Sequence, residues 1–315
     1  METFRLDRSG TGRLVAAGPE AAAFLQRILT QDIDALVEGS GAESFFLTAK
    51  GRYVAFLTLY HRGDHFLVKC PGEVREELAR KLSMFTLGSE ADVSDATEVL
   101  DLVTVLGDGA ASALSAAAGQ APPEELHANA MLPIGGYAVT ACRTDDFGVP
   151  GWDLHFPAAI RDAVDSALGD VGELDPARAE VLRIEAGIAR HGAEMDEKLL
   201  PPEIPALVPR AISYSKGCYV GQETIARIKT YGHVNRELRG LVVKGDAPPA
   251  PGTELTVEGK KVGAITSSCV SESAGGPIAL GFVKRQHFEP GTELDLAIDG
   301  ESTTASVVPA GGPWK

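Results

Sequence analysis

The segment that spans residues 215–231, SKGCYVGQETIARIKTY, concentrates the residue types that can do chemistry. It holds one thiol, Cys218, with the cation Lys216 two residues before it and with Gly217 and Gly221 on either side. Two glycines this close together predict backbone that bends sharply or approaches a ligand closely. A thiol in such a setting is a candidate for a cysteine more reactive than an ordinary one.

The residues after this turn predict a helix over 222–229. On it, Glu223 and Arg227 stand four apart in the order that favours an ion pair. Cys218 would then lie just before a helix N-terminus, where the partial positive charge, together with Lys216, favours the thiolate over the thiol. The alternative is that Cys218 is a small buried apolar residue and that the charged pair lies on the surface, where such pairs contribute little.

A second candidate is a carboxylate on the apolar face of a predicted helix that begins after Asp175. Glu185 shares this face with aliphatic residues at helical spacing, which are Val181, Ile184 and Ile188. A carboxylate placed there needs a partner, either an internal Arg or Lys or a ligand with adjacent N–H donors. The pattern alone favours the internal pair.

The composition and net charge exclude several classes of protein. A chain of 315 residues that is 44% hydrophobic and 23% charged is typical of soluble globular proteins with two or three domains. The net charge of −15 argues against a nucleic-acid partner or an anionic membrane surface. No apolar run approaches the roughly 18 residues of a membrane span, and the N-terminus has no signal or transit character, so we expect a cytoplasmic protein.

The four cysteines, Cys70, Cys142, Cys218 and Cys269, are widely separated and show no metal-ligand spacing. We therefore expect no disulfide scaffold, no metal site and no iron–sulfur cluster held by this chain alone.

The hydrophobic pattern predicts a mixed α+β protein. A hairpin is predicted over residues 4–15, a helix over 19–29, a three-stranded meander over 44–69 and a helix over 73–82. A strand over 100–106 runs into Gly-Asp-Gly-Ala and an alanine-rich helix, but the third glycine of a dinucleotide-binding loop is replaced by Ser112. We further predict a loop over 118–133, two strands and a helix over 137–168, and a small antiparallel barrel or sandwich of short strands after Asn235.

Several motifs resemble one known family. KGCYVGQE at residues 216–223, followed by Arg227, resembles the signature of the YgfZ family, folate-binding iron–sulfur maturation proteins related to the glycine-cleavage T-protein. Other similar pieces are LTQDI at 29–33, TAKGR at 48–52, RIEAGIARHGAEMDE at 183–197, and the later LRGLVV and VGAITSS. The resemblance therefore covers most of the chain.

The resemblance implies a fold and a ligand. It implies an α+β fold with two interleaved α+β subdomains around a central folate cavity, plus a small C-terminal antiparallel β-barrel. Residues 1–234 would form the folate-binding T-protein-like region, and residues 235–315 the barrel domain. The implied cofactor is tetrahydrofolate or a one-carbon derivative of it.

The resemblance also implies roles for single residues. Glu185 matches the glutamate of the RxEAG motif, and a carboxylate can grip the 2-amino group and ring N–H of a pterin with two charge-assisted bonds. Tyr214 or Tyr231 would stack on the pterin ring. Lys50 or Arg52 would contribute to folate binding, or alternatively both lie in a solvated hairpin turn. Lys216 and Arg227 would meet the glutamyl carboxylates, and the other cofactor-binding residues would be Gly217, Tyr219, Gln222 and Glu223.

One departure bears on catalysis. Active T-proteins have an aspartate in the strand after the glycine turn, whereas this chain has Ala55 and Phe56 at the comparable positions. A general acid or base typically contributes about 10² to 10⁴ in rate. We therefore lean away from an enzyme, and the resemblance to the YgfZ family gives Cys218 a redox or transfer role.

Our leading interpretation is a tetrahydrofolate-binding accessory protein in the assembly or repair of iron–sulfur enzymes. Its partners would be a folate and, transiently, iron–sulfur proteins or assembly factors. The alternative is a folate-dependent aminomethyltransferase or demethylase of one-carbon metabolism. A third hypothesis is a remnant of the fold that only mediates protein contacts.

Overall fold

The structure is a computed structural model that describes residues 2–314. The chain forms two compact units, each assembled from separate stretches. The first unit comprises residues up to 49, 54–175 and 210–222, and the second comprises 50–53, 176–209 and the residues from 223 on. The domain boundary that we place between residues 234 and 235 stays a prediction.

The first unit contains a sheet of six strands. They are β1 (Phe4–Asp7), β7 (Leu100–Leu106), β8 (Asn129–Ile134), β9 (Tyr137–Thr144), β10 (Gly151–Pro157) and β11 (Gly172–Glu173), in the spatial order β11-β1-β7-β10-β9-β8. The helices α3 (Ala110–Ala118) and α4 (Arg161–Leu168) pack on this sheet through Leu114 and Val164. The strand and alanine-rich helix predicted from residue 100 onward are confirmed.

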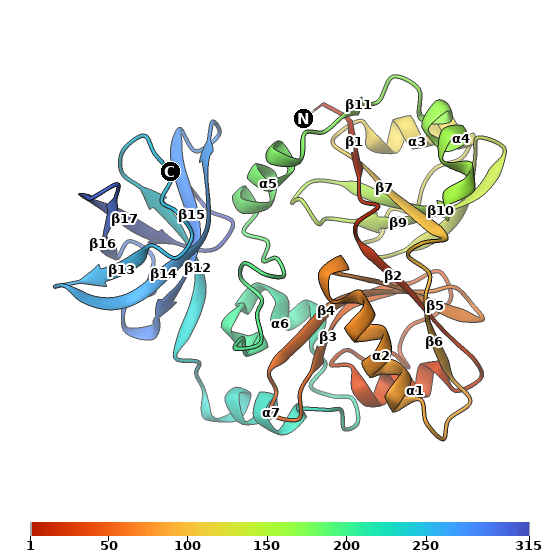
Figure 1. Cartoon of the computed structure of the whole chain (residues 1–315), viewed down its shortest axis with the longest axis horizontal. Helices are drawn as coiled ribbons and strands as arrows, with labels where there is room; N and C mark the ends of the chain where they lie inside the picture. The colour runs from red at the N-terminus through yellow and green to blue at the C-terminus, as the bar shows by residue number, and fades with distance from the viewer. Residues whose placement is uncertain (1, 315) are drawn as a thin grey trace. The chain divides into compact units, whose positions relative to one another are not determined.

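A second sheet of five strands follows a different part of the chain. Its strands are β2 (Gly12–Ala17), β3 (Gly41–Leu47), β4 (Tyr53–His61), β5 (His65–Cys70) and β6 (Asp92–Asp95), in the order β3-β4-β5-β2-β6. The meander predicted over residues 44–69 is confirmed. Because β1 and β7–β11 belong to one sheet and β2–β6 to the other, the two sheets are interleaved in sequence, as Figure 1 shows.

The helices α1 (Ala21–Ile28) and α2 (Arg75–Phe85) supply the apolar face that covers the five-stranded sheet (Figure 1). Phe24 and Leu25 from α1 and Leu78 from α2 are buried against strand residues such as Leu57. Burial of each such side chain contributes roughly 1.5–3 kcal/mol. Both helices occur where the sequence predicts them, within a few residues.

Two predicted elements are wrong. The segment 4–15 is not a hairpin, because β1 pairs with β7 and β11 while β2 pairs with β5 and β6. Each strand joins a different sheet, and Leu14 of β2 is buried in the same core cluster as side chains of α1 and α2. The segment 118–133 is not all loop, because β8 begins at Asn129. Pro133 is tolerated in this strand because β8 lies at the edge of the sheet, next to β9.

The second unit contains the closed barrel. Its strands are β12 (Arg236–Val243), β13 (Glu254–Val257), β14 (Lys260–Ser271), β15 (Gly276–Lys284), β16 (Glu293–Ile298) and β17 (Glu301–Val308). All neighbouring pairs are antiparallel, in the order β12-β15-β14-β13-β16-β17. Alternate residues such as Leu241 and Ile265 fill the interior. The predicted α+β fold with a small C-terminal antiparallel barrel is confirmed.

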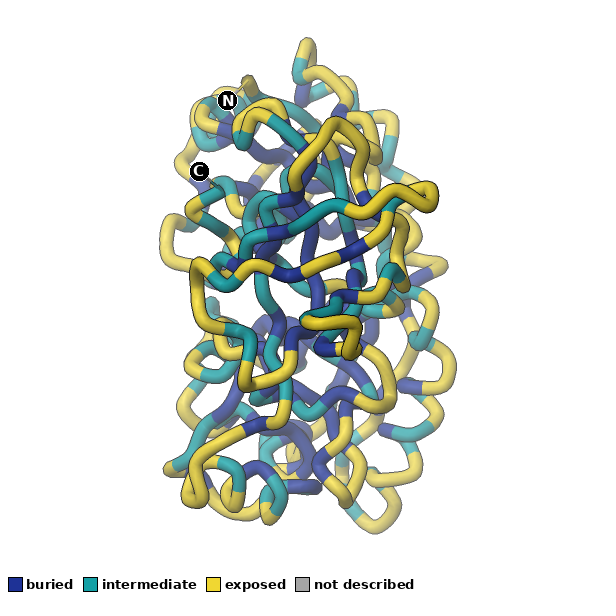
Figure 2. The backbone as a smooth tube through the Cα atoms, turned by 90° about the vertical axis from the view of Figure 1, so that its left-hand side faces the viewer, coloured by how far each residue is buried: buried dark blue, intermediate teal, exposed yellow. Residues whose placement is uncertain are grey.

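Three further helices carry the motifs of interest: α5 (Pro176–Glu185), α6 (Val208–Ala211) and α7 (Gln222–Tyr231). The start of α5 at Pro176 and the start of α7 at Gln222 are as predicted. Figure 2 shows that the buried stretches of backbone alternate with exposed turns along the chain. No helix in the described part of the chain is long and apolar enough to cross a membrane.

Candidate functional site

Glu185 is the last residue of α5, and the chain turns immediately after it. Gly187 has a positive φ of 69°, and a Cβ atom there would meet the backbone nitrogen of Gly311 at 2.2 Å, so only glycine fits. The indole N–H of Trp314 donates to the backbone carbonyl of Glu185 at 2.8 Å. The C-terminal segment of the second unit therefore fixes the end of α5, and with it the backbone of Glu185.

The carboxylate of Glu185 is half-buried and is held by hydroxyl groups. Its Oε1 atom accepts hydrogen bonds from Ser271 Oγ at 2.5 Å and from Ser273 Oγ at 2.7 Å. Its Oε2 atom accepts none from any of the residues 2–314. The carboxylate also stands at the negative end of the α5 dipole. The structure thus gives Glu185 neither the internal cation that the pattern favoured nor full exposure to water.

The internal cation of α5 is instead Arg183, which sequence reasoning missed. Its guanidinium pairs with Glu180 at 2.7 Å and with the buried Glu194 at 3.1 Å. Glu194 also accepts from Ser267 Oγ of β14 at 2.6 Å. The spacing of Glu180 and Arg183 on one helix was a usable signal, whereas Ser267 is 73 residues away from its partner.

Cys218 is exposed, whereas Cys70 and Cys142 are buried and Cys269 is half-buried. All four thiols are free. Of the two glycines around Cys218, Gly221 has a φ of 85° and so makes the sharp bend that was predicted. At Gly217 φ is not positive and an added Cβ would meet no atom within 4 Å, so this glycine borders open space and its close approach to a ligand stays a prediction.

Lys216 binds backbone carbonyl groups within the first unit. Its ammonium is buried and donates to the carbonyls of Gln26 at 2.7 Å, Leu29 at 2.8 Å and Gln31 at 2.7 Å, at the C-terminal end of α1. Burial lowers the pKa of Lys216 to about 8. Since an ammonium has three N–H donors, none is left for the glutamyl carboxylate of a folate or for Cys218.

The tyrosines of the segment differ in exposure. Tyr219 is buried, with the Lys216 ammonium 5.4 Å from its ring centroid, and its hydroxyl has no hydrogen-bond partner in the described part of the chain. Burial raises its pKa. Tyr214 is half-buried, and Tyr231 is 78% exposed at the end of α7. Tyr219 is therefore packed inside the first unit, while stacking of Tyr214 or Tyr231 on a pterin stays a prediction.

The polar residues of α7 face solvent. Gln222 is half-buried, and both Glu223 and Arg227 are exposed. Among residues 2–314 neither of these two charged side chains has an ion-pair partner, so the predicted pair does not form. On an exposed helix such a pair offers only a few tenths of a kcal/mol against the entropy of holding two long side chains. Their role in ligand binding stays a prediction.

Arg210 lies in α6, five residues before the segment 215–231, and sequence reasoning missed it too. Its guanidinium makes two hydrogen bonds to Glu43, at 2.6 and 2.7 Å, and two to Asp145, at 2.7 and 2.9 Å. Burial raises the pKa of Glu43 to about 7. No local signal identifies this network, because the partners lie 167 and 65 residues from Arg210.

The turn at residues 50–53 belongs to the second unit. Arg52 donates to the carbonyl of Lys198, and Tyr53 Oη lies 2.9 Å from His191 Nδ1. Arg52 thus has a partner within the protein, and a folate contact from this turn stays a prediction.

The strand after this turn carries no acid. Ala55 is fully buried, and the ring of Phe56 lies 4.9 Å from that of Phe45. The sequence has no carboxylate at these two positions of β4, and in the structure both side chains make apolar contacts instead.

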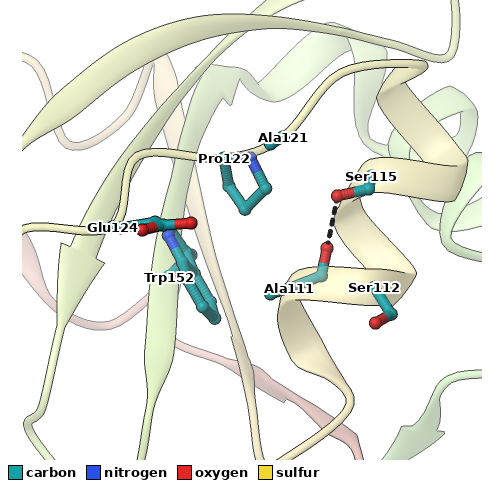
Figure 3. A pocket seen from close by; sticks show the side chains of 7 residues that line it. All are labelled: Ala111, Ser112, Ser115, Ala121, Pro122, Glu124 and Trp152. Carbon is teal, nitrogen blue, oxygen red and sulfur yellow. Dashed lines mark hydrogen bonds between the residues drawn. The ribbon is translucent and has the colours of Figure 1, made fainter.

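A cavity of about 340 Å³ lies elsewhere in the first unit (Figure 3). It lies between α3 and the segment 121–124, with Trp152 at its side and Glu124 as its charged lining residue. It contains none of the predicted site residues. Within residues 2–314 there is also no group of three or more His, Cys, Asp or Glu side chains that could hold a metal ion.

Comparisons with known proteins agree with this fold. Residues 4–209 match the family model described as the GCVT N-terminal domain, and residues 236–311 match the glycine cleavage T-protein C-terminal barrel domain. The glycine cleavage system aminomethyltransferase T from Bartonella henselae superimposes with a TM-score of 0.90 over 98% of this chain and 86% of that one, at 24% identity. The chain belongs to the glycine cleavage T-protein family.

Curated relatives are similar over nearly the whole chain. An aminomethyltransferase of Cutibacterium acnes is 29% identical over 96% of this chain and 85% of that protein. A putative chloroplastic transferase of Arabidopsis thaliana is 26% identical over 93% of this chain and 68% of that protein.

Proposed function

We propose that this protein binds tetrahydrofolate and acts in folate-dependent one-carbon transfer. The observation that carries the proposal is the state of Glu185, whose Oε1 accepts hydrogen bonds from two serine hydroxyls and whose Oε2 accepts none from residues 2–314. The names of the relatives, several of which are aminomethyltransferases, support transfer of a one-carbon unit as the reaction class.

The residues present fit a pterin. A carboxylate at the negative end of a helix attracts N–H donors and repels anions. The 2-amino group and the neighbouring ring N–H of a pterin form such a donor edge, and charge-assisted bonds to it are about twice as strong as neutral ones. Glu185 would therefore hold and orient the pterin, and the bound folate would supply the nitrogen atoms that carry the one-carbon unit.

A titration tests the binding step. We expect the wild-type protein to bind tetrahydrofolate in calorimetry and not to bind p-aminobenzoylglutamate, which has the tail of folate without the pterin. Equal binding of the two compounds would place recognition on the tail and would contradict the role of Glu185.

A turnover assay tests the transfer step. The purified protein, mixed with tetrahydrofolate and an aminomethyl-loaded lipoyl carrier, should form methylene-tetrahydrofolate. Because Ala55 and Phe56 provide no general acid or base, we expect a rate about 10² to 10⁴ below that of a T-protein that has the aspartate. Folate binding with no detectable turnover would contradict transfer and would favour the second candidate.

The second candidate is an accessory role for iron–sulfur enzymes, as in the YgfZ family. Two observations favour it: the exposed thiol of Cys218 within KGCYVGQE, and the apolar strand where T-proteins carry their acid. It predicts that cells with Cys218→Ala lose activity of iron–sulfur enzymes, while cells with the matched Cys269→Ala keep it. Normal activity in the Cys218→Ala strain would contradict this candidate.

A further inference from the structure

Ser271 and Ser273 place two hydroxyl groups on the same oxygen atom of Glu185. Ser271 is the last residue of β14 and is fully buried, and its Oγ also accepts the backbone N–H of Ala274 at 2.9 Å. Ser273 lies in the turn that follows and is exposed. The two Oγ atoms lie 3.0 Å apart, within hydrogen-bonding distance of each other.

The hydrogen atoms of these hydroxyls can be arranged in two ways. A serine hydroxyl has one hydrogen to donate, and a carboxylate oxygen has two acceptor positions. In one arrangement both serines donate to Glu185 Oε1 and fill it. In the other, Ser273 donates to Ser271 Oγ and only Ser271 donates to Oε1. The second arrangement frees one acceptor position on Oε1 by rotating a single hydroxyl hydrogen, with no heavy atom moved.

We propose that Ser271 and Ser273 are positioning residues that preset Glu185 for a ligand edge with two adjacent N–H donors. The inference rests on the proposed function, because it assigns the folate pterin as that ligand. One N–H would bind the unoccupied Oε2, and the other would take the position on Oε1 that Ser273 gives up. Ser271 would stay in place in both states, since Ala274 fixes it and no water reaches it.

The arrangement explains why two serines serve here better than one cation. An arginine or lysine in their place would pair with the carboxylate in the free protein, and the ligand would have to break that pair. Two neutral hydroxyls bind the half-buried carboxylate less strongly than a cation would, because neither donor carries a charge. When the ligand binds, the bond from Ser273 is exchanged for a bond from the ligand. Ser273 acts as a replaceable donor, and Ser271 as the permanent one.

The two serines therefore differ in their expected effects. Ser271→Ala removes the permanent donor, and we expect the dissociation constant for tetrahydrofolate to rise about tenfold. Ser273→Ala removes the donor that competes with the ligand, and we expect binding to be unchanged or a few times tighter. Ser271→Thr keeps the hydroxyl and should bind within about twofold of the wild-type protein.

Selectivity separates positioning from a general structural defect. The probes are tetrahydrofolate and its 2-desamino-2-methyl analogue, which lacks one donor of the pterin edge. We expect the wild-type protein and Ser273→Ala to prefer tetrahydrofolate strongly, and Ser271→Ala to lose most of that preference. A fold defect would weaken the binding of both ligands by the same factor. Thermal melting of each variant is measured in parallel.

The outcomes distinguish this inference from the proposed function. Equal losses in Ser271→Ala and Ser273→Ala, or no loss in Ser271→Ala, with binding by wild type intact, would overturn the inference alone. Absence of tetrahydrofolate binding by the wild-type protein would overturn the proposed function. Loss and reduced selectivity in Ser271→Ala alone would support both.

Discussion

At the scale of single residues, chemistry-bearing side chains were easier to predict than their partners. Cys218 and Glu185 stand out in the sequence by residue type and spacing. The hydroxyls that hold Glu185 lie 86 and 88 residues further along, and no local pattern links them to it. Lys216 was identified as a cation, but its three carbonyl partners lie 185 to 190 residues earlier. Long-range pairing of this kind is decided by tertiary packing.

The exposure of the thiols predicts selective labelling. Burial raises the pKa of Cys70 to about 12 and that of Cys269 to about 11, and it raises the pKa of the fully buried Cys142. Because the thiolate is the reacting species, we expect iodoacetamide at pH 7.5 to label Cys218 first, as read by peptide mass spectrometry. Labelling of Cys269 before Cys218 in the native protein would contradict this prediction, and Cys218→Ser is the control.

His155 predicts a dependence of stability on pH. Burial lowers its pKa to about 3, and neither ring nitrogen has a hydrogen-bond partner in the described part of the chain. Between pH 3 and 6.5 the unfolded chain binds a proton at this residue that the folded protein does not, so stability rises with pH in that range. When the pH falls from 7.5 to 5.5, this residue should lower the free energy of unfolding by about 1.4 kcal/mol.

Denaturant unfolding of His155→Phe checks this value. The variant should lose about 1.4 kcal/mol less than the wild-type protein between pH 7.5 and 5.5. The exposed His233→Gln is the matched control and should behave as wild type. The same pH dependence in His155→Phe and in the wild-type protein would show that this imidazole does not stay neutral in the fold.

At the scale of elements, regular patterns predicted helices and barrel strands well. The start of α5 at Pro176 and the start of α7 at Gln222 follow from local signals. The pairing of β1 and the presence of β8 were predicted wrongly because partner strands decide both: β1 joins a sheet whose other strands begin about a hundred residues or more later. Turn and proline signals alone cannot show which sheet a strand joins.

Lys216 predicts a link between two elements. Its ammonium satisfies carbonyls at the end of α1 that would otherwise be left without donors. We expect Lys216→Met to lower the free energy of unfolding by about 3 kcal/mol, because buried carbonyls lose charge-assisted bonds. Chemical denaturation measures the loss. The exposed Lys260→Met should change stability by less than about 0.5 kcal/mol, and an equal effect of the two changes would contradict the capping role.

At the scale of the whole molecule, the α+β class and the C-terminal barrel were predictable, and the family match agrees with them. The division into compact units was harder to predict. Residues 50–53 and 210–222 each belong to a unit other than that of their sequence neighbours, which no composition change marks. Glu185 belongs to the second unit and Cys218 to the first, and the central folate cavity implied by the resemblance stays a prediction.

The most direct test of the account compares tetrahydrofolate binding by the wild-type protein, Glu185→Gln and the exposed control Glu197→Gln. Removing the charge leaves an amide that offers one acceptor and presents N–H groups to the donor edge of the pterin. We expect Glu185→Gln to weaken binding at least about tenfold, or 1.4 kcal/mol, and Glu197→Gln to bind as wild type. Equal affinity of all three proteins would contradict the account.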